Sequence, residues 1–228
     1  MISKKDKDIS AMSKYLPECV TASLYEDFLK NYQDNELLDL MLCLQEHNIE
    51  INFMFQLFTT TKPTKEQKTL AYELMMKYLE ETKISEGAFQ TVVHELIKLH
   101  YNKEKLAAFI IDNIYSKKNE NDINLWTYCD WLYLLGVKKL KKEYIKIAGD
   151  KELGSARQML FLKFGTFKDE DYLPVMLDNI NDEDVNGHIL SALSKYPDEK
   201  LDKFFEPFLT DNRKWVRKIA EKRLFKTE

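Results

Sequence analysis

Two stretches near the end of the chain decide the fold: DVNGHILSALSKYP at residues 184–197 and WVRKIAEKRLFK at residues 215–226. At a constant offset of 31 residues the alignment pairs Val185 with Val216, Asn186 with Arg217, Ile189 with Ala220 and Leu193 with Leu224. The apolar positions recur every four residues in both stretches, so they lie on one side of a helix. The two stretches are therefore interpreted as copies of one amphipathic helix.

An earlier copy, SARQMLFLKF at residues 155–164, has the same phase 29 residues before the first, with Ala156, Arg157, Leu160 and Phe164 at the matching positions. The segments that precede the later copies also agree. YLPVMLDNIND (172–182) and DKFFEPFLTDN (202–212) each carry a proline and end in Asp or Asn. A single pair of helices cannot bury its apolar side alone, so repeated pairs must stack on one another and share a core.

The rest of the chain shows the helical period as well. The predicted helices cover residues 20–32, 34–47, 49–59, 64–82, 85–101, 103–116, 122–136, 138–148, 152–165, 170–180, 184–195, 198–210 and 212–225. The 228 residues include only 6 glycines and 5 prolines, which disfavours an all-β fold with its many tight turns. No Gly/Ser/Pro-rich linker divides the chain, so one helical-repeat domain over residues 1–228 is predicted.

These motifs resemble the HEAT repeats of the armadillo/HEAT superfamily. In that family a helix that often contains proline leads through an Asp-bearing turn into a second helix, which opens with Val-Arg and continues to Ala and Leu. The matching residues here are Asp211, Val216, Arg217, Ala220 and Leu224. The resemblance implies an all-α superhelix, a right-handed solenoid of antiparallel helix pairs, with recognisable units over residues 150–226 and divergent helix pairs over residues 1–120.

The turn residues of this pattern have a physical role. An Asp in the turn can accept hydrogen bonds from the unpaired N–H groups that open the next helix. An Arg directly after the apolar residue, as at Arg157 and Arg217, can reach the Asp of a neighbouring unit. We therefore expect a ladder of ion pairs that ties successive turns together.

Composition and charge restrict the class of protein. The net charge of −4 disfavours a surface devoted to nucleic acid, although residues 213–226 form a basic helix. That helix is interpreted either as a strip that contacts phosphates or as the polar cap of a last repeat. Cys19, Cys43 and Cys129 lack the close spacing of a metal or redox motif and are predicted to be free thiols. The chain has no apolar leader and no long apolar run, so a cytoplasmic protein without a membrane partner is expected.

No metal site and no cofactor are predicted. Residues 182–187 match the first half of a calcium loop, but the loop's twelfth position, which needs a bidentate carboxylate, is Leu193. His94 and His100 are six residues apart, so their imidazoles diverge around a helix. The acidic segment is better explained as a helix N-terminus whose carboxylates complement the helix dipole.

Trp126, Asp130 and Trp131 form the most distinctive cluster, within the segment INLWTYCDWLYLL. Trp126 and Asp130 are four residues apart and share a helix face. The cluster is similar to one in HEAT-like DNA glycosylases of the bacterial alkylpurine type, which place Trp, Asp and a later Arg in a concave groove. That resemblance implies Asp130 as catalytic carboxylate and Arg157 as its partner. The alternative is that both tryptophans pack between helix layers while Asp130 is solvated or pairs with a lysine of residues 138–146.

The leading functional prediction is a non-enzymatic module that binds a protein partner on its concave face, in a regulatory or immunity-type role. The alternative is a DNA-repair glycosylase of the alkylpurine type. Nucleic acid is the less favoured partner because the net charge is negative. The candidate binding residues are Trp126, Asp130, Arg157, Asn186 and Arg217.

Overall fold

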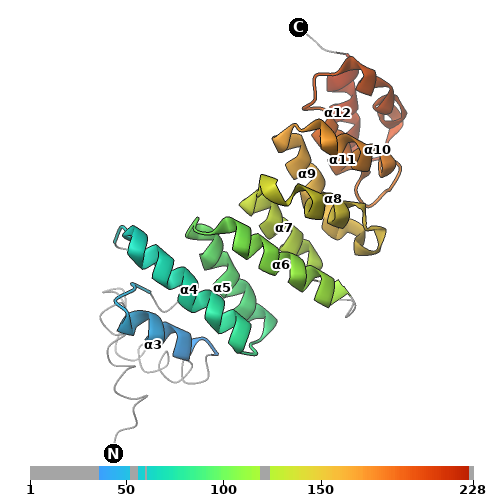
Figure 1. Ribbon diagram of the computed structural model, residues 1–228. Helices are drawn as coiled ribbons and strands as arrows, with labels where there is room; N and C mark the ends of the chain where they lie inside the picture. The colour runs from blue at the N-terminus through green and yellow to red at the C-terminus, as the bar shows by residue number, and fades with distance from the viewer. Residues whose placement is uncertain (1–35, 52–55, 60, 119–123, 226–228) are drawn as a thin grey trace, which may run out of the picture. The chain divides into compact units, whose positions relative to one another are not determined.

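The structure is a computed structural model that describes residues 36–51, 56–59, 61–118 and 124–225 (Figure 1). Within these ranges the regular secondary structure is helical, and a single isolated bridge pairs Ile51 with Leu57. The all-α prediction is therefore confirmed for the described part. The predicted helix at residues 20–32 and Cys19 lie outside it. The chain divides into two compact units, Met1–Tyr101 and Asn102–Glu228, and a single continuous repeat domain stays a prediction.

The first unit contains α3 (Leu38–Glu46), α4 (Lys65–Glu81) and α5 (Glu86–Lys98), with α4 packed against both of the others. The start of α4 is fixed by a reciprocal cap. The amide of Gln67 donates to Oγ1 of Thr64 at 3.2 Å, and the amide of Thr64 donates to Oε1 of Gln67 at 3.0 Å. Since this cap satisfies two otherwise unpaired N–H groups, the helix predicted at 64–82 begins where the sequence pattern placed it.

The helix predicted at residues 49–59 is wrong over its described part. The amide of Phe58 donates to the carbonyl of Glu50 at 3.0 Å beside the Ile51–Leu57 bridge, and Phe58 has a left-handed φ of 51°. The buried Glu50 carboxylate accepts from the amide of Thr61 at 2.9 Å and from its hydroxyl. Side-chain acceptors thus supply the turn with hydrogen bonds that a helix would have taken from its own backbone.

The second unit is built mainly from helices that pack in a row. Its elements are α6 (Lys103–Lys118), α7 (Leu125–Leu135), η2 (Lys138–Leu140), α8 (Lys141–Gly149), η3 (Lys151–Arg157), α9 (Gln158–Phe167), η4 (Glu170–Tyr172), α10 (Leu173–Asp178), α11 (Asn186–Leu193), η5 (Glu199–Phe204), η6 (Glu206–Thr210) and α12 (Lys214–Leu224). Helix α9 lies between α7 and α11, and α11 packs in turn against α12 (Figure 1). The remaining elements cover this row, with α6 on α7, α8 on α9 and η6 on α12.

The helices of the row run in the same direction. Gly165, near the end of α9, faces Ala192, near the end of α11. Gly187, at the start of α11, faces Trp215, at the start of α12. The end of α7 likewise meets the second half of α9, where Lys163 lies against Gly136. Each of these contacts joins two N-terminal ends or two C-terminal ends of neighbouring helices. The four helices α7, α9, α11 and α12 are therefore parallel.

Burial in the row follows the spacing of the sequence copies and extends it to α7. Trp131, Leu160 and Ile189 are buried at successive intervals of 29 residues, and Leu135, Phe164 and Leu193 repeat that pattern. In α12, Ala220 at the position that matches Ile189 is buried, whereas Leu224 at the position that matches Leu193 is only partly buried. Val216 repeats the buried positions of Ala156 and Val185. The apolar positions identified from the sequence therefore form the contacts between neighbouring helices.

The helices predicted at 198–210 and 152–165 depart most from the predicted form, whereas those predicted at 138–148 and 170–180 open with the short 3-10 segments η2 and η4. The helix predicted at 198–210 is replaced by the short 3-10 segments η5 and η6, and Pro207 in η6 has no N–H to continue an α-helical ladder. The helix predicted at 152–165 begins as the 3-10 segment η3. Gly154 interrupts η3 with φ 49° and ψ −132°, a conformation accessible mainly to glycine.

The predicted turn chemistry is present at five turns of the second unit. In each case Oδ1 of an aspartate accepts the amide hydrogen of the residue two positions later. The donors are the amides of Glu152 to Asp150, Asp171 to Asp169, Asp184 to Asp182, Lys200 to Asp198 and Arg213 to Asp211. Asp150, Asp169 and Asp198 cap η3, η4 and η5 in this way, as expected of capping aspartates. The bonds to Asp182 and Asp211 lie in the turns before α11 and α12, whose own N-termini have no side-chain cap.

Candidate interaction surface

Trp126 lies on the surface of α7 and Trp131 lies in the core. Trp126 is 43% exposed, whereas Trp131 is 4% exposed and its ring centroid lies 4.9 Å from that of Tyr128. The two tryptophans are five residues apart, so they point to different sides of the helix. The prediction that both pack between layers is therefore correct for Trp131 and wrong for Trp126.

Asp130 shares the exposed side of α7 with Trp126 and Leu134, which is 48% exposed. Its carboxylate forms no ion pair with a lysine of the described residues 138–146. Partial burial raises the pKa of Asp130 above its ordinary value. The exposed side of α7 thus combines a large aromatic ring, an aliphatic side chain and a carboxylate without a salt bridge to those lysines.

Arg157 is part of the core and does not lie on an open surface. Its side chain is fully buried, and Nη2 donates to Oδ2 of Asp182 at 2.5 Å. Nη1 donates to Oδ1 of Asn179 at 3.1 Å and to the carbonyl of Ala148 at 3.0 Å. Because these acceptors occupy its donors, Arg157 forms the expected link between turns and is not positioned to hold a ligand beside Asp130.

Asn186 and Arg217 are also engaged within the fold. Asn186 is buried, and its Oδ1 accepts a hydrogen bond from Nη2 of Arg213 at 2.8 Å. Arg217 donates from Nη1 to the backbone carbonyls of Asp211 at 2.5 Å and Asn212 at 3.1 Å, and it does not reach a neighbouring aspartate side chain. The ion pair predicted between Arg217 and an aspartate of a neighbouring turn is therefore absent, since Arg217 bonds to carbonyls of its own turn. Arg213 instead connects this turn to Asn186, at the start of α11.

Side chains on the exposed side of the helix row, Trp126 and Asp130 among them, form a surface that we call the row face. It comprises Trp126, Asp130 and Tyr133 of α7, Lys163 of α9, His188 of α11, Lys195 just after α11, and Trp215 and Lys222 of α12. Trp126 and Tyr133, His188 and Lys195, and Trp215 and Lys222 are each seven residues apart, so each pair lies on one side of its helix.

Contacts between helices make the row face continuous. The ammonium group of Lys163 lies 4.6 Å from the ring centroid of Tyr133, which joins α9 to α7. Gly165 packs closely against Ala192, which joins α9 to α11. The charge of Lys195, just after α11, lowers the pKa of Lys163. The rings of His188 and Trp215 meet edge to face at 5.5 Å, which joins α11 to α12.

Trp215 is 44% exposed although it is held firmly in place. A Cβ atom added to Gly187 would lie 2.3 Å from the Trp215 ring, so the indole rests directly on the glycine backbone. The Arg213 guanidinium lies 5.9 Å from the same ring. Burial and the charge of Arg213 lower the pKa of His188, which favours its neutral form beside the indole.

The described residues contain no group of three or more His, Cys, Asp or Glu side chains arranged to hold a metal ion. Cys43 and Cys129 are free thiols, and burial raises the pKa of Cys129 to about 12. None of the described helices combines the length and the apolar character needed to cross a membrane.

Comparison of the chain with protein-family models, with curated proteins and with solved structures yields no match. Interpretation of the row face therefore depends on its own geometry. Its members Lys163, His188 and Trp215 were not among the candidate residues predicted from the sequence. One signal could have identified Trp215: in the register of buried residues, it occupies the position that Trp126 occupies in α7.

Proposed function

We propose that the chain is a non-enzymatic interaction module of the HEAT-like helical-repeat type, which binds a protein partner through the row face. The parallel row of helices, the 29-residue interval of buried positions and the aspartate turns support the repeat architecture. In such a stack the row would form the inner surface, where this class of fold presents extended binding sites.

The observation that carries the proposal is the exposure of Trp126 and Trp215 on well-packed helices. Exposed tryptophan is unfavourable in water, and tryptophan is enriched among the residues that dominate binding energy at protein interfaces. Lysines between the two rings, Lys163 and Lys195, would add electrostatic selectivity for an acidic partner surface.

Affinity capture from the native cell tests this proposal. The bait would be the wild-type chain, a Trp126→Ala/Trp215→Ala variant and a Phe225→Ala control. Phe225 is 61% exposed and lies beyond α12, so its removal deletes a comparable apolar side chain outside the row face. We expect a stoichiometric partner with the wild type and the control, and at least a tenfold loss with the double variant. Equal capture by all three baits would exclude the row face as the binding surface.

A second candidate is the glycosylase, favoured by one observation: Trp126 and Asp130 share an exposed side of α7, and partial burial raises the pKa of Asp130. Against it, Arg157 is buried and bound to Asp182. Duplex-DNA binding that weakens steeply with salt, together with base release that an Asp130→Asn variant lacks, would support the enzyme. Absence of DNA binding at low salt would exclude it.

A further inference from the structure

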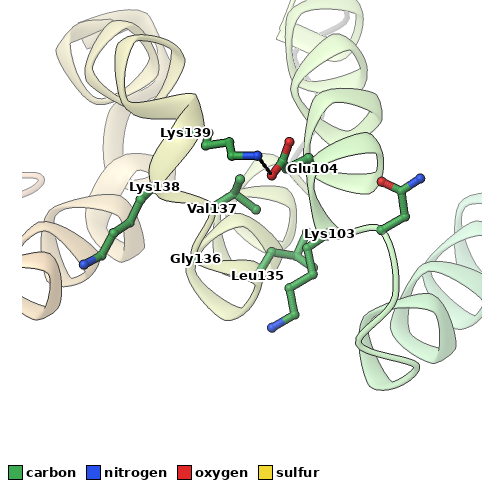
Figure 2. Close-up of a pocket in the computed structure, with 8 residues that line it drawn as sticks. Lys103, Glu104, Leu135, Gly136, Val137, Lys138 and Lys139 are labelled. Carbon is green, nitrogen blue, oxygen red and sulfur yellow. Dashed lines mark ion pairs between the residues drawn. The ribbon is translucent and has the colours of Figure 1, made fainter.

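A cavity of about 340 Å³ lies between the start of α6 and the turn that joins α7 to η2. Figure 2 shows Lys103 and Glu104 on the α6 side and Leu135, Gly136, Val137, Lys138 and Lys139 on the turn. The volume suits a small molecule rather than a single water. All of its lining residues belong to the second unit.

The charges around this cavity are unevenly paired. Lys139 and Glu104 neutralise each other, with Nζ and Oε1 2.7 Å apart (Figure 2). Lys103 and Lys138 form no ion pair with any residue that the structure describes. The charge of Lys138 acts on the Asp169 carboxylate, which is already bound to Lys141 at 2.5 Å. Two ammonium groups at the cavity thus lack a dedicated counter-charge.

Lys163 adds a third cation from α9. A Cβ atom added to Gly136 would lie 2.8 Å from Nζ of Lys163, so the ammonium group lies directly on the cavity-lining glycine. Lys163 also converges with Lys138 on one ring: their Nζ atoms are 5.6 and 5.7 Å from the ring centroid of Phe167. The aromatic ring partly compensates both charges but cannot neutralise them.

Other cations act on the Lys163 ammonium group. Burial lowers the pKa of Lys163, and the charges of Lys103 and Lys195 lower it further. The Glu104 carboxylate that lines the cavity is already paired with Lys139. An anion that bound there would relieve the repulsion between Lys163 and Lys103. A dianionic phosphate group matches three ammonium groups better than a singly charged carboxylate does.

We propose that this cavity is a binding site for a small phosphate-bearing ligand, held by Lys103, Lys138 and Lys163. The site shares Lys163 with the row face, but Lys103 and Lys138 lie outside that face, so their variants test this site separately from the proposed partner. Glycine suits position 136 because its φ of 57° lies in the left-handed region, and a Cβ atom added there would also make the Lys163 ammonium group move.

The test is a titration of the full chain with inorganic phosphate, pyrophosphate and acetate, followed by calorimetry and by NMR of labelled lysine side chains. We expect saturable 1:1 binding in the order pyrophosphate, phosphate, acetate, weakened by added sodium chloride. The signal of Lys163 should titrate at higher pH when pyrophosphate is bound, because the anion favours the charged ammonium group.

The neighbouring ion pair provides the matched control. Lys103→Gln and Lys138→Gln should each weaken pyrophosphate binding by about fivefold or more. The double variant Glu104→Gln/Lys139→Gln should leave it unchanged, because it removes a neutral ion pair and keeps the net charge of the site. Lys163→Gln should have the largest effect, and Lys103→Gln keeps the test valid if loss of Lys163 disturbs folding. The proposal is overturned if pyrophosphate shows no saturable binding, or if the double variant weakens it as much as Lys138→Gln.

Discussion

Arg157 donates a hydrogen bond to Asp182 from a fully buried guanidinium group, with Nη2 and Oδ2 2.5 Å apart and the two residues 25 positions apart in the chain. This pair ties the turn before α9 to the turn before α11. At the next turn a different residue donates. Asn186 occupies the position that matches Arg157, and Nη2 of Arg213 donates a hydrogen bond to its Oδ1. The same guanidinium group forms an ion pair with Asp211 at 2.7 Å. The ladder is therefore kept even though its donor comes from a different residue.

Replacing Arg157 by alanine should destabilise the second unit by about 3–5 kcal/mol, because Asp182 would be left without its buried counter-charge. Arg217→Ala is the matched control, since Arg217 is partly exposed and bonds only to backbone carbonyls of its own turn. It should cost about 1 kcal/mol or less. Urea denaturation measures both losses, and equal losses would contradict a special role for Arg157.

Stability should fall in acid between about pH 4 and pH 2. Burial alone would raise the pKa of Asp182, but hydrogen bonds from Arg157 and the Asp184 amide outweigh it and hold the pKa below its ordinary value. The hydrogen bond from Arg213 is the main cause that lowers the pKa of Asp211 to about 2. The unfolded chain binds these protons more tightly, so their stabilisation is complete above the ordinary aspartate pKa near 4 and is lost below it.

Urea midpoints measured from pH 6 to pH 2.5 check this prediction. The free energy of unfolding should decrease as the pH falls through the stated window. An Asp211→Asn variant should be less stable than wild type at pH 6 and should show a shallower decline. A variant with an unchanged decline would show that the Arg213–Asp211 pair does not contribute.

Gly165 should be a sensitive position in the helix row. A Cβ atom there would lie 2.7 Å from Cα of Ala192, so Gly165→Ala forces α9 and α11 apart and should cost about 1–3 kcal/mol. Gly87→Ala in α5 is the control, because nothing lies within 4 Å of an added Cβ. That change should be neutral or stabilise by about 0.5 kcal/mol through helix propensity. Thermal unfolding of the two variants separates the cases, and a neutral Gly165→Ala would contradict the close packing of α9 and α11.

The two tryptophans of α7 should respond differently to truncation. Trp131→Ala removes a buried ring and should cost about 3–5 kcal/mol, whereas Trp126→Ala should cost less than about 1 kcal/mol. Iodide should quench the fluorescence of Trp126 but not that of Trp131. The measurement uses two single-tryptophan variants, each with Trp215→Phe and with either Trp126 or Trp131 also replaced by Phe. Similar quenching of both would place Trp126 in the core and remove it from the row face.

Periodicity in the sequence predicted most helices because their apolar faces and caps agree, as in α4 with its Thr64–Gln67 cap. It failed at residues 49–59, where Ile49 and Ile51 are buried in a turn whose hydrogen bonds come from the Glu50 carboxylate. A helical spacing of apolar residues does not reveal such side-chain acceptors. They lie 11 residues from the Thr61 donor, beyond any local pattern.

The candidate site was harder to predict than the fold, because a sequence pattern does not report solvent exposure. Arg157 was a candidate for lining a groove, and one interpretation packed Trp126 between helix layers, yet Arg157 is fully buried and Trp126 is 43% exposed. The cost of burying the Arg157 charge is offset only by acceptors from distant turns, Asn179 and Asp182. Lys163 owes its position to Tyr133 and Phe167, and that arrangement depends on the tertiary packing of α7 and α9.

Site-specific photo-crosslinking in the native cell measures whether the row face binds a partner. A photoreactive phenylalanine analogue would replace Trp126, Trp215 or Phe225 in separate variants, with folding checked by denaturation. The proposed interaction module predicts that positions 126 and 215 capture the same protein and that position 225 does not. Capture of unrelated proteins at the two tryptophan positions, or of nothing at either, would contradict it.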